Sequence, residues 1–303
     1  MSPRSLFAPL WGSAALLLTL TALQWGGNAV ASRASVGEVG PLTLTSLRWV
    51  GVCAIMLPIM GGAVWAHRAT LLPLWPKLIL TSFLGYTAFN TLMYTAAQYT
   101  SAINIGILQG SIPVFVLLGA LALHGTRIGR WQVVGVAVTI VGVLLVASRG
   151  DPGRLAALEF NIGDLWMIAA CGFYAMYTVL LRDRPGVPGL VFFTTLATIA
   201  LFISLPAMLW EIATAPVSLP TPKGWALVAF VCVFPSLLSQ ILFMRGVELI
   251  GPGRAGVYVN LVPVFAAGLA VALLGEPFGW YHAGALALVL GGIAIAERGK
   301  RPA

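Results

Sequence analysis

Polar and aromatic side chains recur inside long apolar stretches of this chain, where an unpaired polar group is strongly unfavourable. Some are three or four residues apart, as are Asn90 and Tyr94, and would share one face of a helix. Inward-facing amides, phenols and indoles at similar depth can hold a small polar ligand. The candidate binding residues are Trp25, Asn28, Tyr86, Asn90, Gln109, Tyr174, Tyr258 and Asn260.

Each candidate also has a purely structural interpretation. A buried amide can form a hydrogen bond between helices, which contributes about 0.6–2 kcal/mol in membranes. A tyrosine near a helix end can lie in the interfacial aromatic belt, although Tyr86, Tyr174 and Tyr258 fall within segment interiors. The site hypothesis therefore depends on the whole set, since several segments each bring an amide or a phenol to similar depth.

Arg48 is the basic residue that lies well inside an apolar segment. An arginine at the centre of a membrane helix costs about 2.5–3.5 kcal/mol on insertion scales. Its position about two turns from a predicted helix end allows snorkelling or structural pairing. The alternative is contact with a substrate carboxylate, because an intramembrane charge is by default a functional candidate.

Two prolines fall in mid-segment at matching places, Pro113 and Pro263. Proline removes an N–H and crowds the carbonyl four residues earlier. We therefore expect a helix kink at each proline, which leaves the carbonyls of Gln109 and Val259 without their usual hydrogen-bond partners. In lipid such carbonyls must face protein or a wet cavity. The kinks therefore either place carbonyls beside a substrate or serve packing alone.

Several chemistries have no support in the sequence. Asp164, Glu211, Glu248 and Glu276 fall at predicted helix ends or turns, as do His67, His124 and His282. The lack of a deep carboxylate favours facilitated movement, exchange or coupling through an edge residue. The sequence has no Walker motif, no metal-ligand spacing and no catalytic cluster. We therefore expect a protein that binds no cofactor and no metal and that is not an enzyme.

The elements that must position these residues follow from composition. The chain has 303 residues, of which 59% are hydrophobic and 9% charged. Soluble domains average about 25% charged residues, so lipid must be the solvent for most of this surface. The net charge of +8 then indicates basic anchors beside a lipid bilayer rather than a nucleic-acid partner. Cys53, Cys171 and Cys232 lie in apolar runs, which predicts buried thiols without a disulfide framework.

A bilayer core about 30 Å thick requires about 20 apolar residues per helix. Lipid leaves no backbone group unpaired, and alternating strand patterns are absent from the sequence, so we expect an all-α integral membrane protein. The first segment has features of a signal peptide, but its length favours a retained helix. Ten transmembrane helices are predicted, at 8–32, 42–64, 75–97, 101–123, 131–147, 164–181, 190–210, 224–244, 253–274 and 280–296.

The basic residues between these segments predict the orientation, because cytoplasmic loops carry the excess of Lys and Arg. Twelve lie on the side of the N-terminus and four on the other, which predicts a multi-pass protein of the cell (inner) membrane with both termini cytoplasmic. The twelve are Arg4, Arg68, Lys77, Arg127, Arg130, Arg182, Arg184, Arg245, Arg254, Arg298, Lys300 and Arg301. The four are Arg33, Arg149, Arg154 and Lys223.

The second half of the chain repeats the first about 150 residues later. Ile112-Pro113-Val114-Phe115 matches Val262-Pro263-Val264-Phe265, and Gly125 matches Gly275. We therefore expect two five-helix repeats, 1–150 and 151–303, integrated in one membrane domain. Since five is odd, the second repeat enters the membrane from the opposite side, and the repeats are inverted. Inverted repeats commonly enclose a substrate site near the bilayer midplane.

The repeat, together with several short motifs, resembles the EamA family of the drug/metabolite transporter superfamily. The motifs are Trp25-Gly26-Gly27-Asn28, Leu47-Arg48-Trp49, Pro263-Val264-Phe265, Gly275-Glu276-Pro277 and Gly291-Gly292. Within the family the chain looks most like the YddG-type amino acid exporters. It departs from the pattern at Gly125-Thr126-Arg127, where the first repeat lacks the Gly-Glu-Pro turn. That departure argues against a symmetrical role for Glu276.

The resemblance implies an alternating-access transporter that exports small metabolites, most of all aromatic or neutral amino acids. The alternatives are a multidrug or other metabolite carrier of the same fold, and a non-transporting membrane scaffold. A phosphorylated substrate would require several deep cations, and Arg48 alone qualifies. Gly135, Gly142, Gly284 and Gly291 recur on helix faces and predict close helix packing, without assigning an oligomeric state.

Overall fold

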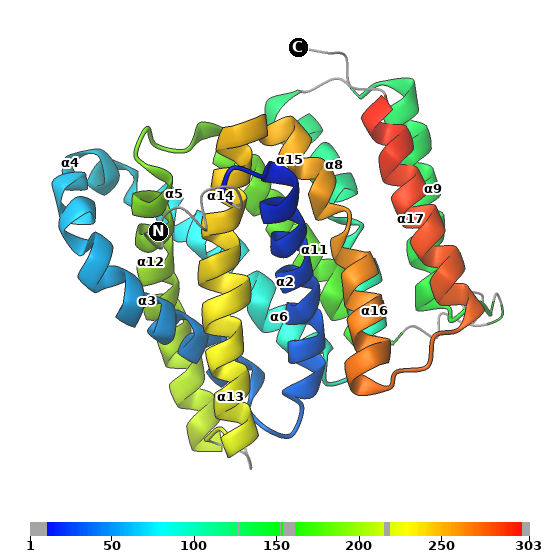
Figure 1. The fold of residues 1–303 in the computed structure, drawn as a ribbon, viewed down its shortest axis with the longest axis horizontal. Coiled ribbons are helices and arrows are strands. Elements are labelled where there is room, and N and C mark those ends of the chain that lie inside the picture. Colours follow the sequence, from blue (N-terminus) through cyan, green and yellow to red (C-terminus); the bar gives the residue numbers. More distant parts are fainter. Residues whose placement is uncertain (1–10, 126–127, 152, 154–160, 215–218, 299–303) are drawn as a thin grey trace, which may run out of the picture.

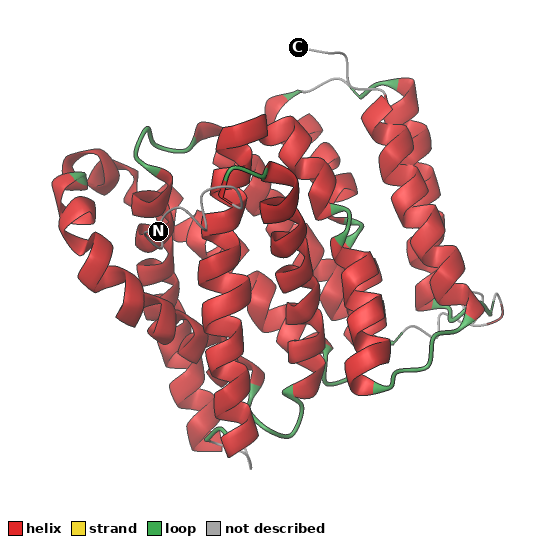
Figure 2. Cartoon of the chain, viewed as in Figure 1, coloured by secondary structure: helices red, strands yellow, loops and turns green. Residues whose placement is uncertain are grey.

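The computed structural model describes residues 11–125, 128–151, 153, 161–214 and 219–298. Every regular element within these ranges is a helix, as Figure 2 shows. Long helices run up and down side by side, joined by short connections at the two ends of the molecule (Figure 1). The all-α fold expected from composition is confirmed.

The first half makes five crossings. The third consists of two α-helices on either side of a π-helix, and the fourth is broken in two. The short helices α4 (Arg68–Leu71) and η1 (Leu72–Leu74) connect the second crossing to the third. The crossings are α2 (Ala14–Ala34), α3 (Pro41–Ala66), α5 (Trp75–Ser82) with η2 (Phe83–Ala88) and α6 (Phe89–Ala96), α7 (Ala102–Gln109) with α8 (Ile112–His124), and α9 (Arg130–Ala147).

The second half makes five more crossings with the same interruptions. These are α11 (Ile162–Leu180) with η3 (Leu181–Asp183), α12 (Gly189–Thr214), α13 (Pro222–Val231) with the π-helix η4 (Cys232–Leu238) and α14 (Ser239–Ile250), α15 (Pro252–Val259) with α16 (Val262–Leu274), and α17 (Trp280–Arg298). The observed ends lie within a few residues of most predicted ones, and the start of the first predicted segment lies outside the described residues.

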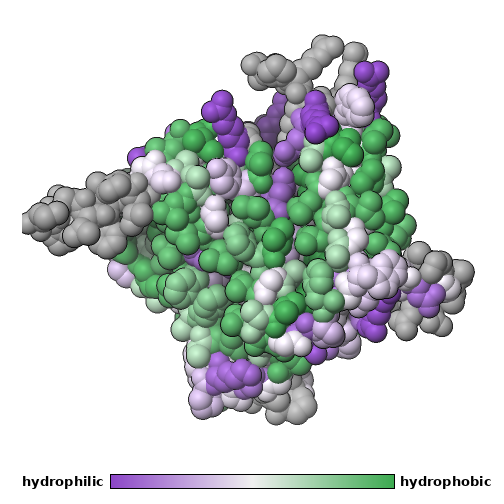
Figure 3. Space-filling model, turned by 45° about the vertical axis from the view of Figure 1, so that its right-hand side comes forward, coloured by the Kyte–Doolittle hydropathy of each residue, from purple (hydrophilic) through white to green (hydrophobic). Residues whose placement is uncertain are grey.

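Nine helices in the described part of the chain are long and apolar enough to cross a membrane. The remaining crossing, residues 75–96, carries the candidates Tyr86 and Asn90 and is less apolar. Figure 3 shows apolar side chains over the middle of the surface and hydrophilic ones gathered toward its two ends. Large apolar side chains such as Ile59, Phe202 and Leu209 are exposed, as expected of a surface solvated by lipid.

The helices pair across the two repeats rather than within them. Helix α3 packs on α12, and α9 packs on α17. Helix α2 packs on α14 and α16, and its counterpart α11 packs on α6 and α8. If each helix is replaced by its counterpart in the other repeat, the same set of contacts results. The packing therefore has the pseudo-two-fold symmetry expected of inverted repeats.

Both interruptions of the helices recur in each repeat. The fourth crossing ends at Gln109 and resumes at Ile112, and the ninth ends at Val259 and resumes at Val262. Pro113 and Pro263 each lie in the first turn of the resumed helix, where the missing N–H requires no partner. The π-helices η2 and η4 occupy matching positions in the third and eighth crossings. The sequence did not predict these π-helices.

Glycines let α9 and α17 approach closely. A Cβ at Gly135 would meet the carbonyl oxygen of Gly292 and lie 2.6 Å from the backbone nitrogen of Ala296. A Cβ at Gly292 would meet Thr139 Oγ1. A Cβ at Gly291 would have no neighbour within 4 Å. The prediction that Gly291 belongs to this close contact is therefore wrong, because its neighbour Gly292 is the residue that faces α9.

Candidate functional site

A cluster of polar groups lies between the repeats, and we call it the polar centre. It consists of Asn28 on α2, Arg48 on α3 and Asn90 and Tyr94 on α6, together with the backbone carbonyls of Tyr86 and Pro235. The four side chains are all buried. Since the donors come from the first repeat and the Pro235 carbonyl from the second, the cluster spans their interface.

Arg48 organises the polar centre. Its Nη1 donates to Asn90 Oδ1 at 2.5 Å and to Tyr94 Oη at 2.9 Å, and its Nη2 donates to the Pro235 carbonyl at 3.3 Å. Tyr94 Oη in turn donates to Asn28 Oδ1 at 3.3 Å. The side chain is 5% exposed, so the snorkelling alternative does not describe this arginine.

The charge of Arg48 is solvated entirely by neutral groups. No carboxylate lies within 4 Å of it among the described residues. A guanidinium has five N–H donors, and three of them are used here. Nε is buried without a partner in the described chain. Nε–H and one N–H of Nη2 are therefore unused within the described chain, and an arginine can bind a carboxylate through two parallel hydrogen bonds.

The π-helices supply the carbonyls of the polar centre. A π-turn shifts the hydrogen-bond register, which frees a carbonyl from the helical ladder. The Tyr86 carbonyl in η2 accepts from Asn90 Nδ2 at 2.7 Å and from Trp49 Nε1 at 3.2 Å. The Pro235 carbonyl in η4 accepts from Arg48 Nη2 and from Ser239 Oγ. Each repeat thus contributes one such carbonyl from a matching element.

Aromatic rings extend from one side of the polar centre. Trp49 stacks on Tyr86 with the ring centroids 4.7 Å apart, and Tyr86 also contacts the rings of Tyr177 and Phe193. Tyr174 lies between Tyr177 and Phe89, with centroid distances of 5.3 and 4.8 Å. A Cβ at Gly85 would collide with the Tyr177 ring, so this glycine allows the ring to lie on η2.

Trp25 joins the two repeats beside the polar centre. Its Nε1 donates to Ser239 Oγ at 3.0 Å, and its ring lies 5.4 Å from that of Phe243. Ser239 Oγ donates to the Pro235 carbonyl at 2.7 Å, which connects the indole to the same carbonyl that Arg48 contacts.

The structure brings together Trp25, Asn28, Arg48, Tyr86, Asn90 and Tyr174, but the other predicted residues are not in this network. Gln109, Tyr258 and Asn260 make no side-chain hydrogen bond within the described residues, and Gln109 Nε2 is buried without a partner. All three lie at the breaks beside Pro113 and Pro263. They remain predicted binding residues at the kinks, apart from the polar centre.

Sequence reasoning missed the Pro235 carbonyl and did not select Tyr94 as a binding residue. A proline in the middle of an apolar segment was the available signal for Pro235, since it cannot continue the helical ladder. Tyr94 carried a signal too, because it lies one turn after Asn90 on the same face.

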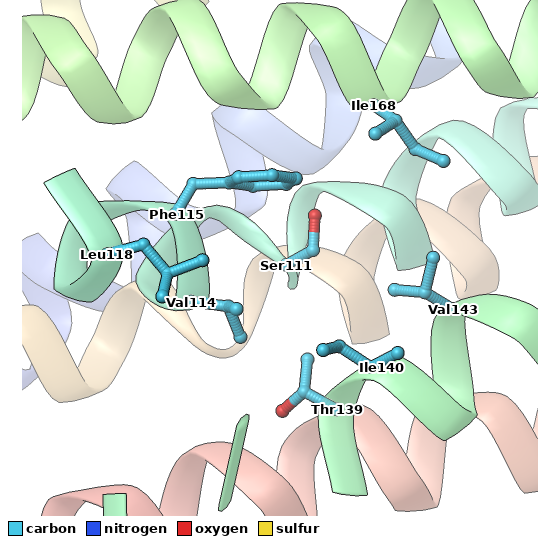
Figure 4. A pocket seen from close by; sticks show the side chains of 8 residues that line it. All are labelled: Ser111, Val114, Phe115, Leu118, Thr139, Ile140, Val143 and Ile168. Carbon is cyan, nitrogen blue, oxygen red and sulfur yellow. The ribbon is translucent and has the colours of Figure 1, made fainter. Parts of the chain in front are cut away.

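A separate cleft of about 120 Å³ lies between α8, α9 and α11 (Figure 4). It is lined by the apolar side chains of Val114, Phe115, Leu118, Ile140, Val143 and Ile168, and by Ser111 and Thr139. Both hydroxyls donate to backbone carbonyls about one turn earlier in the chain, namely those of Leu108 and Gly135. The cleft is smaller than typical ligand pockets of about 300–1,000 Å³, and it offers no group to bind a charge.

Carboxylates cap helices at the end of the molecule opposite the described chain ends. Glu276 accepts from the backbone N–H groups of Ala102 and Ile103 at 2.8 and 3.0 Å, at the start of α7. Glu211 accepts from those of Leu42 and Thr43 at the start of α3. These contacts satisfy the unpaired donors of a helix N-terminus and complement its dipole. Glu276 therefore has a structural role, because it caps the N-terminus of α7.

Comparison with known proteins identifies the class. Residues 12–148 and 161–297 each match the EamA-like transporter family, so the protein belongs to that family and is a multi-pass membrane transporter. A solved crystal structure superimposes with a TM-score of 0.64 at 23% identity, covering 96% of this chain and 99% of the other. That likeness supports the fold.

Several relatives match over most of their length. YyaM of Bacillus subtilis, described as an uncharacterized transporter, is 26% identical over an alignment that covers 87% of this chain and 86% of its own length. A probable terminal-alkyne amino-acid exporter of Streptantibioticus cattleyicolor is 27% identical over 92% of this chain and 90% of its own. YedA of Escherichia coli K12, described as an uncharacterized inner membrane transporter, is 22% identical over an alignment that covers 96% of this chain and 92% of its own length.

Proposed function

We propose that this transporter exports neutral and aromatic amino acids across the inner membrane, with both termini in the cytoplasm. The observation that carries the proposal is the buried Arg48, which has two unused N–H donors and no acidic partner among the described residues. A buried cation solvated only by neutral groups favours an anionic ligand, and the fork of an arginine fits a carboxylate.

The rest of an amino acid matches the surroundings of Arg48. The Tyr86 and Pro235 carbonyls and Asn28 Oδ1 are acceptors for an ammonium group. The rings of Trp49, Tyr86, Tyr174 and Tyr177 form an apolar wall for a side chain. The proposed export of an amino acid agrees with the name of the Streptantibioticus cattleyicolor relative.

Transport through this site requires the repeats to separate, because the side chains of the polar centre are buried. The pseudo-two-fold pairing of helices provides two equivalent ways of opening, one at each end of the molecule. We propose that the breaks beside Pro113 and Pro263 are where α7 and α15 bend during this exchange, with Gln109, Tyr258 and Asn260 meeting the substrate there.

Purified protein in liposomes loaded with labelled amino acids tests the proposal. We expect efflux of neutral and aromatic amino acids above that of empty liposomes, and none of the corresponding amines that lack a carboxylate. Efflux of amines or other solutes without that of any amino acid would instead favour a multidrug or other metabolite carrier. Absence of flux for every amino acid would contradict the proposed substrate class.

A further inference from the structure

The symmetry between the repeats is broken at α7 and α15. Helix α7 packs on α16, α11 and α2, and it also contacts α9 and α17. Its counterpart α15 packs on α14 and α2, but it makes no comparable contact with α11 or with α8, the counterpart of α16. One of these two short helices is therefore docked between the repeats, and the other is not.

Matched residues on the two helices differ in burial. Ile107 on α7 is 0% exposed, whereas Val257, its match in the second repeat, is 49% exposed. A Cβ at Gly106 would meet the Cβ of Ala266 on α16. A Cβ at the matching Gly256 would have no neighbour within 4 Å. The side of α7 that is pressed against α16 thus corresponds to a side of α15 that no helix covers.

The helices that would receive α7 and α15 differ in the same way. Pro263 and Ala266 lie on the buried face of α16 that α7 covers. On α8, the matching Pro113 is exposed and the matching Val116 is only partly buried. Both surfaces of the missing contact between α8 and α15 are therefore uncovered. The molecule is closed at the end where α7 begins and open at the end where α15 begins.

A carboxylate of the second repeat holds α7 in its docked position. Glu276, in the turn between α16 and α17, accepts from the N–H groups of Ala102 and Ile103 at 2.8 and 3.0 Å. These are the first two residues of α7, where a negative charge also complements the helix dipole. The matching turn of the first repeat, residues 125–129, contains no acid.

Helix α15 is not suited to the same contact. It begins with Pro252, the match of Ala102, and a proline has no N–H to donate. Arg254 lies in its first turn, where a positive charge opposes the helix dipole. No side chain caps this helix among the described residues. The sequence therefore stabilises the docked position of α7 and provides no equivalent contact for α15.

We propose that Glu276 is a one-sided lock, which makes the state that is closed at the start of α7 and open at the start of α15 the resting state of the transporter. Since only one repeat has the acid, the two states of the cycle differ in free energy even without substrate. With both termini in the cytoplasm, as proposed above, the resting protein is open to the cytoplasm, where an exporter takes up its substrate. The lock rests on the proposed movement of α7 and α15, and it does not depend on which substrate is carried.

Thiol labelling without substrate tests the lock. The three native cysteines, all buried, are replaced, and either Ile107→Cys or Val257→Cys is introduced. The protein is placed in nanodiscs, which leave both faces accessible to a charged methanethiosulfonate reagent that labels only thiols in contact with water. We expect labelling of Val257→Cys to be at least about tenfold faster than that of Ile107→Cys, because one hydrogen bond to a charged group corresponds to about that factor. Equal rates, or slower labelling of Val257→Cys, would overturn the proposal.

Two variants weaken the lock from its two sides. Glu276→Gln loses the charge, and its amide nitrogen cannot accept from the second N–H. Labelling of Ile107→Cys should then rise about tenfold while that of Val257→Cys falls, because the two ends open in turn. Ala102→Pro gives α7 the first residue of α15. It removes one N–H donor at a position where helices tolerate proline, and should cause the same exchange.

Glu248→Gln is the control. Glu248 is an exposed acid on α14, and its partner Arg245 lies on the same helix, so its loss should change neither rate. Rates that neither Glu276→Gln nor Ala102→Pro alters would overturn the lock. A rise at both cysteines would overturn it too, because unfolding exposes both thiols and Glu276 would then only stabilise the fold. A failure of the amino acid flux assay leaves these outcomes unaffected.

Discussion

Replacement of Arg48 by methionine is expected to separate carboxylate recognition from folding. The substitution removes Nε–H and the unused N–H of Nη2, the two donors proposed for the substrate carboxylate. A hydrogen bond to a charged group contributes about 1.5–3 kcal/mol. At 1.4 kcal/mol per factor of ten, the loss of one such bond weakens binding about 10- to 150-fold, and the loss of both weakens it further.

We expect Arg48→Met to lower the stability of the folded protein much less than it lowers the affinity for the substrate. Arg48 is a buried charge without an ion pair among the described residues, and an apolar residue of similar length removes its desolvation penalty. Asn90 and Tyr94 lose their arginine donors, but they lie one turn apart on α6 and can pair with each other or with water. We therefore expect a thermal midpoint close to that of the parent protein.

The assay compares an amino acid with its decarboxylated amine by calorimetric titration of purified protein. Arg48→Met should weaken amino acid binding by the factor given above and leave amine binding unchanged, while Arg48→Lys should recover part of the affinity through charge alone. Equal loss for both ligands would refute the carboxylate assignment. Unfolding of the variant would show instead that the arginine is mainly structural.

Three further predictions concern packing, the predicted site and pH. Gly292→Leu should lower the free energy of unfolding by about 1–3 kcal/mol, because the new side chain overpacks against α9. Gly291→Leu is the control and should leave the free energy of unfolding unchanged, because its Cβ would have open space. Equal thermal midpoints for the two variants would contradict the assignment of Gly292 to the contact with α9. Asn90→Leu, Gln109→Leu and Tyr258→Leu should each impair flux in liposomes without loss of folded protein, and normal flux in all three would mean that the cavity is misplaced. The hydrogen bond from Thr221, together with Lys223 at 3.1 Å, lowers the pKa of Glu38 below its ordinary value of 4.5. The stability contributed by Glu38 is therefore complete above that value and is lost as the pH falls through the folded-state pKa; Glu38→Gln should show a flatter acid limb in denaturation curves.

Much of the fold was predictable because the information is local or periodic. Apolar segments of membrane length can satisfy their backbone only as helices, which determines the secondary structure without any tertiary contact. Duplicated motifs 150 residues apart, with an odd number of segments between them, imply inversion by counting alone. Proline at matching places predicted a kink in each repeat, and the structure has a break just before each proline, since proline cannot continue the ladder of the preceding helix.

The site was only partly predictable because it depends on contacts between distant segments. Asn28, Arg48, Tyr86 and Asn90 were identifiable as polar groups in apolar surroundings. That they meet, while Gln109, Tyr258 and Asn260 lie apart from them, follows from the packing of α3 against both α6 and η4. The π-helices had no sequence signal beyond Pro235, because a shifted register depends on the neighbouring helices that receive the freed carbonyl.

The sequence alone thus determined a lipid-solvated bundle of two inverted halves, since hydropathy and repetition are properties of the chain itself. Tertiary structure decided which ionisable groups are buried. Asp164 and His282 do lie at helix ends, as expected, yet the ends of α7, α11 and α17 meet and exclude solvent from both. Burial is a property of surfaces brought together from remote parts of the chain, and no spacing along one segment encodes it.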